Sequence, residues 1–234
     1  MPKFSLFDGN TLWILAGLSV TITSIVVAVR ALQMRVRRNR VLSARLATIA
    51  DARDGELVIV RGTARGQSLM TTPVTGKNAL WTRIMVRGEV ARPGLLRFTT
   101  LLRQVQGQTF VVEAEGGQFS VATANARVVL APERIERSYT PEGEVIEERL
   151  LPLFRKHAAG ELKDAVVEDK AFVDLRTFEE AILPGDEVHV IGIARRGGPD
   201  GLQITPSPDG LYIVLGDVKQ LATNGALWSD RPDV

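Results

Sequence analysis

Residues able to do catalytic chemistry are few in this chain. It has no cysteine and two histidines, His157 and His189, which excludes thiol catalysis, disulfides and cysteine-based zinc sites. Neither histidine has a second ligand at metal-binding spacing, and no phosphate-loop or serine-nucleophile motif occurs. Adjacent carboxylates at Glu147-Glu148 and Glu179-Glu180 are typical of a solvated face. We therefore expect no enzymatic activity, no metal and no cofactor.

The best local candidate for binding is the loop Thr71–Lys77 (TTPVTGK). A proline followed by Thr-Gly specifies a tight turn, and the hydroxyls can bond to the nearby backbone. The loop is therefore interpreted either as a well-built connector or as an exposed polar loop that binds a partner. The second interpretation makes the candidate binding residues Thr72, Pro73, Thr75, Gly76 and Lys77.

The element that must position everything else is the apolar segment Leu12–Val29. It contains eighteen residues without a charge, and ten of them are Leu, Ile or Val. As a helix it would extend about 27 Å, which is close to the hydrocarbon thickness of a bilayer. We predict a short N-terminal tail at residues 1–11 and a transmembrane helix at residues 12–29. A buried core helix is less favoured, because no face of the segment is polar.

A cluster of arginines follows the apolar segment, and Asp51 is the first acidic residue after it. We expect a basic juxtamembrane helix over residues 30–52, with arginines at the lipid headgroups. The positive-inside rule then places the N-terminus outside and the rest in the cytoplasm. A cleaved signal peptide is disfavoured, because arginines occupy the place of a small-residue cleavage site. The membrane-surface arginines are Arg30, Arg35, Arg37, Arg38, Arg40 and Arg45.

Four small residues share one face of the predicted transmembrane helix, namely Gly17, Thr21, Ser24 and Ala28. Such a stripe lets two membrane helices approach closely, so it predicts possible self-association. Small residues also occur in membrane helices without any such role. Nucleic acid is not expected as a partner, because the basic residues flank the membrane without an aromatic recognition motif.

Residues 53–221 change to the period of short strands. Alternation is clearest in Ala79–Val90, where Arg83 and Arg87 fall on one side. The other predicted strands are Glu56–Arg65, Leu95–Val105, Thr109–Ala114, Gln118–Ala122, Ala126–Leu130, Ala165–Leu175, Asp186–Arg196, Gly201–Thr205 and Leu211–Leu215. Turn signals separate them at regular intervals, among them Arg92–Gly94, a hairpin turn at Gly116-Gly117 and Gly197–Gly201. A helix is expected over Ile146–Ala159, and residues 222–234 form a polar tail. The sequence therefore predicts a mainly β (α+β) fold. It has an N-terminal transmembrane helix followed by an antiparallel β-barrel or sandwich-like domain with a helical insertion.

Two segments of this domain match each other at an offset of 130 residues. GELVIVRGTAR (55–65) and GDEVHVIGIAR (185–195) share Gly, Val, Val, Gly, Ala and Arg in register. Strands draw on few residue types, so coincidence is one explanation. The other is that the two strands hold equivalent places in a barrel. Gly62 and Gly192 would then be structural glycines at its bends.

The order of these motifs resembles a known family. One N-terminal membrane helix precedes DGELVIVRGTAR, a TPVTGK turn with a W-x-R-I-x-V strand, VEAEGGQFSV and AILPGDEVHVIGIARR. This order is similar to the GIDE or "beside a membrane" (BAM) domain, over roughly residues 45–215. That domain occurs in membrane E3 ubiquitin ligases of the MULAN/MAPL type and in prokaryotic relatives without a RING finger.

The resemblance implies a membrane-anchored, non-catalytic interaction or scaffolding module at the cytoplasmic membrane face. Its expected partners are the lipid bilayer and another protein. The alternative is a component of an E3 ubiquitin transferase-like or other membrane enzyme system. The ligases carry a zinc-binding RING finger, and a chain without cysteine cannot build one.

Overall fold

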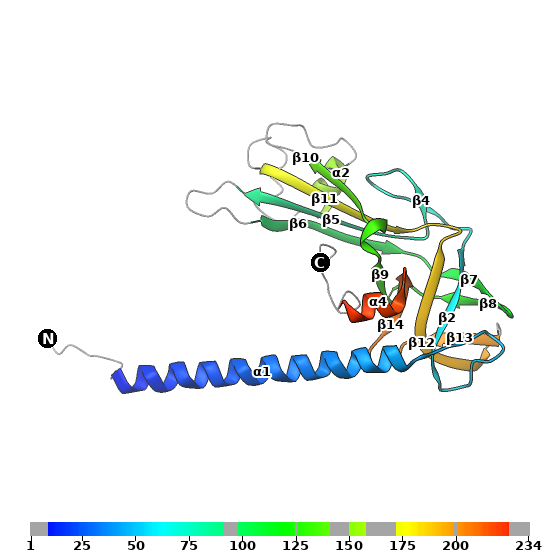
Figure 1. Ribbon diagram of the computed structural model, residues 1–234. Helices are drawn as coiled ribbons and strands as arrows, with labels where there is room; N and C mark the ends of the chain where they lie inside the picture. Colours follow the sequence, from blue (N-terminus) through cyan, green and yellow to red (C-terminus); the bar gives the residue numbers. More distant parts are fainter. Residues whose placement is uncertain are drawn as a thin grey trace. The chain divides into compact units, whose positions relative to one another are not determined.

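A computed structural model describes residues 9–90, 98–124, 126–140, 150–157, 172–198 and 201–224 (Figure 1). The chain divides into two compact units, Met1–Ser43 and Ala44–Val234. Of the predicted turn at 197–201, residues 197, 198 and 201 lie in strands. Residues 199–200 lie outside the described residues, and so does the whole of the predicted turn at 92–94. So do most of the N-terminal tail, Glu147-Glu148 and the polar tail beyond residue 224.

The first unit is the single helix α1, Gly9–Ser43, which is 35 residues long (Figure 1). It has no proline, and its aliphatic side chains are exposed from Leu18 to Val36, whereas Val41 near its C-terminal end is 3 % exposed. The Thr23 hydroxyl donates to the Ser19 carbonyl oxygen at 2.8 Å, so this polar group is satisfied within the helix. Among the described residues, α1 is the one helix long and apolar enough to cross a membrane.

The helix ends earlier than predicted. We expected it to continue to residue 52, but it stops at Ser43, whose hydroxyl donates to the Arg40 carbonyl. Residues Arg45–Leu46 instead form the short strand β1 at the start of the second unit, where it pairs in parallel with β2, Leu57–Arg65. The helical period of the apolar residues here was misleading, because backbone pairing in the sheet outweighs local preference.

The second unit is built on a mixed eight-stranded sheet with the order β8-β7-β2-β12-β14-β9, to which β1 and β13 are added. Its strands confirm most of the predicted segments, and the sheet does not close into a barrel. Their bounds are β2 Leu57–Arg65, β7 Phe110–Ala114, β8 Gly117–Val121, β9 Ala126–Leu130, β12 Glu187–Gly198, β13 Gly201–Thr205 and β14 Leu211–Leu215.

The two matched segments pair with each other. Strands β2 and β12 run antiparallel with Val60 opposite Val190. A local two-fold axis passes through this point, so that Gly62 lies opposite Val188 and its equivalent Gly192 lies opposite Val58. The flanking hydrogen bonds repeat on both sides at 2.8–2.9 Å. Gly55 and Glu56 exchange bonds with Ala194, while the equivalent Gly185 and Asp186 exchange bonds with Ala64. The repeat is therefore a structural one.

Gly62 and Gly192 allow neighbouring strands to pass closely. A Cβ atom at Gly62 would lie 2.4 Å from the Glu113 carbonyl oxygen of β7, and one at Gly192 would lie 2.5 Å from that of Thr205 on β13. Gly192 is also where β12 changes its neighbour from β14 to β13. The prediction made both glycines bends of a barrel, and the sheet does not close into one. Both glycines instead lie where neighbouring strands come into close contact.

A second, four-stranded antiparallel sheet has the order β10-β11-β5-β6 (Figure 1). Its strands are β5 Trp81–Val90, β6 Phe98–Gly107, β10 Glu136–Thr140 and β11 Phe172–Ile182. One face buries an aliphatic cluster that includes Ile84, Val86, Leu102 and Leu175, against which Leu151 packs from α2. The sheet joins the larger core where Leu80 donates to the Ile182 carbonyl at 2.8 Å.

The remaining elements are short. Helix α2 is Leu151–His157 in the described part, so Pro152 stands in its first turn, where it starts a helix and does not kink one. The others are β3 Met70–Thr71, β4 Asn78–Ala79, the 3-10 turn η1 Pro132–Arg134 and α4 Val218–Thr223. The sequence did not predict α4, which Asp217 caps by accepting from the Gln220 amide.

Candidate functional site

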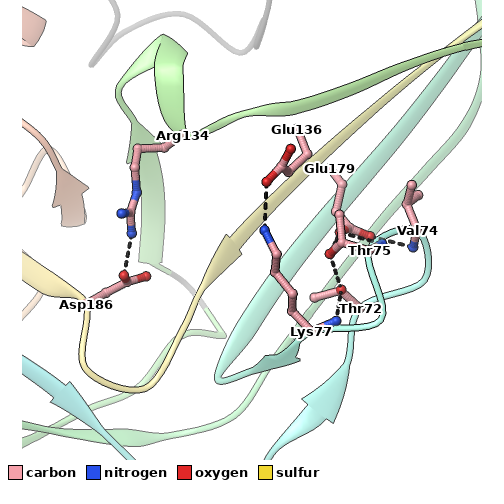
Figure 2. Close-up of polar contacts among 8 residues, drawn as sticks. All are labelled: Thr72, Val74, Thr75, Lys77, Arg134, Glu136, Glu179 and Asp186. Atoms are coloured by element: carbon pink, nitrogen blue, oxygen red, sulfur yellow. Dashed lines mark hydrogen bonds and ion pairs between the residues drawn. The ribbon is translucent and has the colours of Figure 1, made fainter.

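The candidate loop between β3 and β4 is hydrogen-bonded to a buried carboxylate. Glu179 on β11 is 2 % exposed and accepts the backbone N–H groups of Val74 at 2.7 Å and Thr75 at 3.2 Å (Figure 2). The Thr75 hydroxyl donates to the same carboxylate. Charge-assisted hydrogen bonds of this kind are about twice as strong as neutral ones. Glu179 therefore fixes the shape of the turn.

The loop is also bonded within itself. Thr72 is 1 % exposed, its hydroxyl accepts the Lys77 N–H at 3.0 Å, and its carbonyl accepts the Gly76 N–H at 3.1 Å. The Lys77 ammonium pairs with Glu136 on β10 at 2.7 Å (Figure 2). Because so many of its polar groups already have partners in the fold, this geometry favours the connector interpretation of the loop over the binding one.

A second link of this kind holds the turn at the end of β11. Asp186 pairs with Arg134 of η1, and its other carboxylate oxygen accepts the Leu183 N–H at 2.7 Å (Figure 2). The contact fixes η1, and with it the start of β10, against the turn that leads into β12.

Glu179 and Glu180 do not form the solvated pair that their adjacency suggested. Both are 2 % exposed. Alternation along β11 also sends them to opposite faces of the sheet, so they do not face each other. Glu180 pairs with Arg83 on β5, whose guanidinium lies 5.7 Å from the centre of the Trp81 ring. This buried ion pair with its cation–π contact stabilises the sheet. Glu180 and Glu179 lie on opposite faces and therefore do not form a pair of carboxylates for acid–base chemistry.

The face of the four-stranded sheet opposite its aliphatic cluster is rich in arginine. Cross-strand partners share a face, and the pairing connects Arg137, Phe178, Met85 and Arg103 in one row. The next row connects Tyr139, Arg176 and Arg87. We call this side the basic face, defined by Arg83, Arg87, Arg103, Arg137 and Arg176.

The basic face carries a groove of about 700 Å³ over β5, β10 and β11. Arginine side chains, one tyrosine and one phenylalanine line it, and no acidic side chain does so among the described residues. Tyr139 is 55 % exposed, whereas Phe178 is 9 % exposed. The groove offers positive charge, hydrogen-bond donors and aromatic surface, and Ser138 and Thr177 also line it.

Histidine contributes little to any site. His189 lies on β12, half-buried, and burial lowers the pKa of its imidazole below the usual range, an effect that Glu187 partly opposes. The side chain of His157 lies outside the described residues. Among the described parts of the chain, no group of three or more His, Asp or Glu residues is placed to hold a metal ion.

The membrane-surface arginines separate into two groups. Arg30, Arg35, Arg37, Arg38 and Arg40 all lie on α1. Arg45 lies on β1, where it pairs with Glu56 at 3.1 Å and donates to the Asp51 carbonyl at 2.8 Å. This bond to Glu56 raises the pKa of Arg45 and lowers the pKa of Glu56. Arg45 therefore has its contacts within the second unit, and the membrane-surface role of all six arginines stays a prediction.

The small residues Gly17, Thr21, Ser24 and Ala28 all fall within the regular part of α1. Helical geometry places residues three and four apart on one side, so the predicted stripe keeps its spacing.

The sequence alone indicated two of the five arginines of the basic face, and Arg103 was not singled out. The alternation in Ala79–Val90 set Arg83 and Arg87 on one side of a strand, but Arg137 and Arg176 were not singled out. The signal was present in the two-residue periods of Arg137 with Tyr139 and Arg176 with Phe178. Only the pairing of β10, β11 and β5 brings these residues to one place.

Comparisons of this chain with models of protein families, with curated proteins and with solved structures find no match.

Proposed function

We propose that this chain is a membrane-anchored, non-catalytic recognition module of the GIDE type that binds an acidic protein partner on its basic face. The observation that carries the proposal is the unequal use of the four-stranded sheet. One face is buried under α2 and the loop at 72–77, while the other carries the exposed side chains of Arg103, Arg137, Arg176, Tyr139 and Val105. Exposed aromatic and arginine side chains are typical of recognition surfaces.

The anchor in this proposal is α1. At 35 residues it is about 52 Å long, well beyond the hydrocarbon thickness of a bilayer. It continues without a break through Arg30 to Ser43, where a cleaved signal sequence would need an extended cleavage site. The arginines of α1 favour an N-terminus outside and a cytoplasmic second unit, in a single-pass arrangement.

Site-specific photo-crosslinking in native membranes tests the recognition surface. We expect a crosslinker at Val105 or Tyr139 to capture one acidic protein, because both side chains are more than half exposed on the basic face. The yield should fall several-fold when Arg137 is changed to Gln, and also at raised salt.

The matched position is Leu69, which is 42 % exposed and lies beside the loop at 72–77. The proposal requires that this position does not capture the same protein. Capture from Leu69 that Arg137→Gln leaves unchanged would move the binding surface to the loop and contradict the proposal.

Self-association through α1 is a separate prediction. Gly17→Leu and Ser24→Leu should lower the yield of a crosslinked dimer in membranes several-fold, because bulky side chains separate helices that pack through small residues. Val26→Leu changes the opposite side of the helix and should leave the yield as it is. Unchanged dimer in both leucine variants excludes this face as an interface.

A further inference from the structure

The four-stranded sheet ends in an edge that no described strand covers. Strand β6 is the last in the order β10-β11-β5-β6, and no described residue pairs with its outer side (Figure 1). It is ten residues long, whereas β10 at the opposite edge has five. From Arg103 to Gly107 its residues are exposed, apart from the partly buried Gln104. An edge of this kind presents unpaired backbone groups that can accept another strand.

The hydrogen bonds of the ladder determine which residues turn their backbone outward. The Gln108 N–H donates to the Leu80 carbonyl oxygen at 3.2 Å, so these two residues form a hydrogen-bonded pair in the register of β5 with β6. Hydrogen-bonded and non-hydrogen-bonded pairs alternate along an antiparallel ladder. Gly107, Val105 and Arg103 therefore direct their N–H and C=O groups away from β5, toward the open side.

The side chains at these outward positions lie on the basic face. Arg103 is the cross-strand partner of Met85, and Val105, two residues further along the strand, is 52 % exposed. The Arg103 guanidinium is exposed and has no hydrogen bond or ion pair with any described residue. The open edge thus combines outward backbone groups with a cation that can pair with a carboxylate.

Strand β6 also lacks most of the features that keep edge strands from pairing. Natural edges are often short or carry lysine or proline, and the sequence FTTLLRQVQG contains neither residue. Its irregularity is a register shift opposite Val86 and Arg87, which leaves residues 102–107 in a regular ladder. A second copy paired antiparallel through this edge would bring two basic faces side by side, which is unfavourable. An acidic strand would meet the opposite charge.

We propose that the outer edge of β6, at residues 102–107, binds an extended acidic segment of the protein partner as an added antiparallel strand. The inference rests on the proposed function, because the carboxylates of the segment lie on the basic face, and it deepens that function by naming how the partner is held. Main-chain hydrogen bonds supply affinity in this mode of recognition, and alternate side chains supply specificity.

The test uses the full-length chain in phosphatidylcholine nanodiscs and a short labelled peptide in which Glu alternates with Val or Thr. In the added strand, the Glu residues lie opposite Arg103 and Val105 and turn their N–H groups toward β6. N-methylation of the Glu residues should therefore weaken binding by about 10–100-fold, because hydrogen bonds to β6 are lost. N-methylation of the Val and Thr residues is the matched control and should change the affinity by less than about 3-fold, because their N–H groups point away.

A variant of the protein tests the same hydrogen bonds from the other side. Val105→Pro removes an N–H that points away from β5, the position at which an edge strand tolerates proline. It should weaken binding of the unmethylated peptide by about 10-fold, whereas Val105→Ala keeps the N–H and should weaken it by less than about 3-fold. The methylated peptides decide the question if Val105→Pro folds poorly.

Three results would overturn the added strand: no binding of the unmethylated peptide, equal binding of the two methylated peptides, or a dimer of the chain that Val105→Pro abolishes. If the acidic partner still crosslinks from Tyr139 in those cases, the proposed function stands and only the strand addition is refuted. Loss of the crosslink from Tyr139 contradicts the proposed function itself.

Discussion

Glu179→Ala is expected to lower the free energy of unfolding of the second unit by about 3 kcal/mol. The change removes the carboxylate that accepts two backbone N–H groups and a hydroxyl of the loop at 72–77. Those donors then lose a charged acceptor in a place that water reaches poorly. Urea unfolding of the full-length protein in detergent micelles, followed by tryptophan fluorescence, measures the loss.

Glu136→Ala is the matched control. Glu136 contacts the same loop through Lys77, but both side chains are about half exposed. Exposed ion pairs contribute little, so its change should stay within about 0.5 kcal/mol. Glu179→Gln should fall between the two variants, because an amide oxygen still accepts one of the N–H groups. Equal effects for Glu179→Ala and Glu136→Ala would show that the loop does not depend on the buried carboxylate.

Gly62→Ala and Gly192→Ala are each expected to destabilise the protein by about 2–3 kcal/mol. In both cases the new Cβ atom would meet a backbone carbonyl oxygen of the neighbouring strand, at 2.4 Å for Gly62 and 2.5 Å for Gly192. A backbone atom cannot rotate away as a side chain can, so β7 or β13 must shift. The same urea experiment measures the effect, and the local two-fold relation predicts similar values for the two variants.

The glycines at the ends of these strands separate contact from backbone strain. Gly55 and Gly185 have φ angles of 80° and 92° and no atom within 4 Å of an added Cβ. Gly55→Ala should cost about 1 kcal/mol through backbone conformation alone, and Gly55→Asn should cost less, because asparagine tolerates positive φ. At Gly62, by contrast, Asn should destabilise the protein at least as much as Ala does. If Asn relieved the loss at Gly62 as well, close strand contact would not be the cause.

The strands of the larger sheet were predictable because local signals agreed. Turn glycines such as Gly116 and Gly117 adopt positive φ where the hairpin was expected. The positions of β2, β7, β13 and β14 followed from strand-forming residues between such turns. The pairing of the strands could not be predicted from local signals. The parallel contact of β9 with β14, for example, joins segments that are far apart in the chain.

The candidate site was harder to predict for the same reason. The loop at 72–77 was visible as a motif, but its anchor Glu179 lies more than a hundred residues away. Adjacent carboxylates read as solvated because on a helix or loop they share a side, whereas on β11 each points to a different face with a separate partner. The strand β11 itself was expected to end at Leu175, and it continues to Ile182.

The pairing of β2 with β12 has a consequence for how the protein is made. Val60 can pair with Val190 only after Val190 has been synthesised, and the 130 positions that separate them take roughly 6–26 s to synthesise. During that interval β2 lacks the partner that occupies its centre, and its exposed edge is open to wrong strands. Contacts so distant in sequence also slow folding once the chain is complete. We expect newly made chains to depend on chaperones until β12 leaves the ribosome.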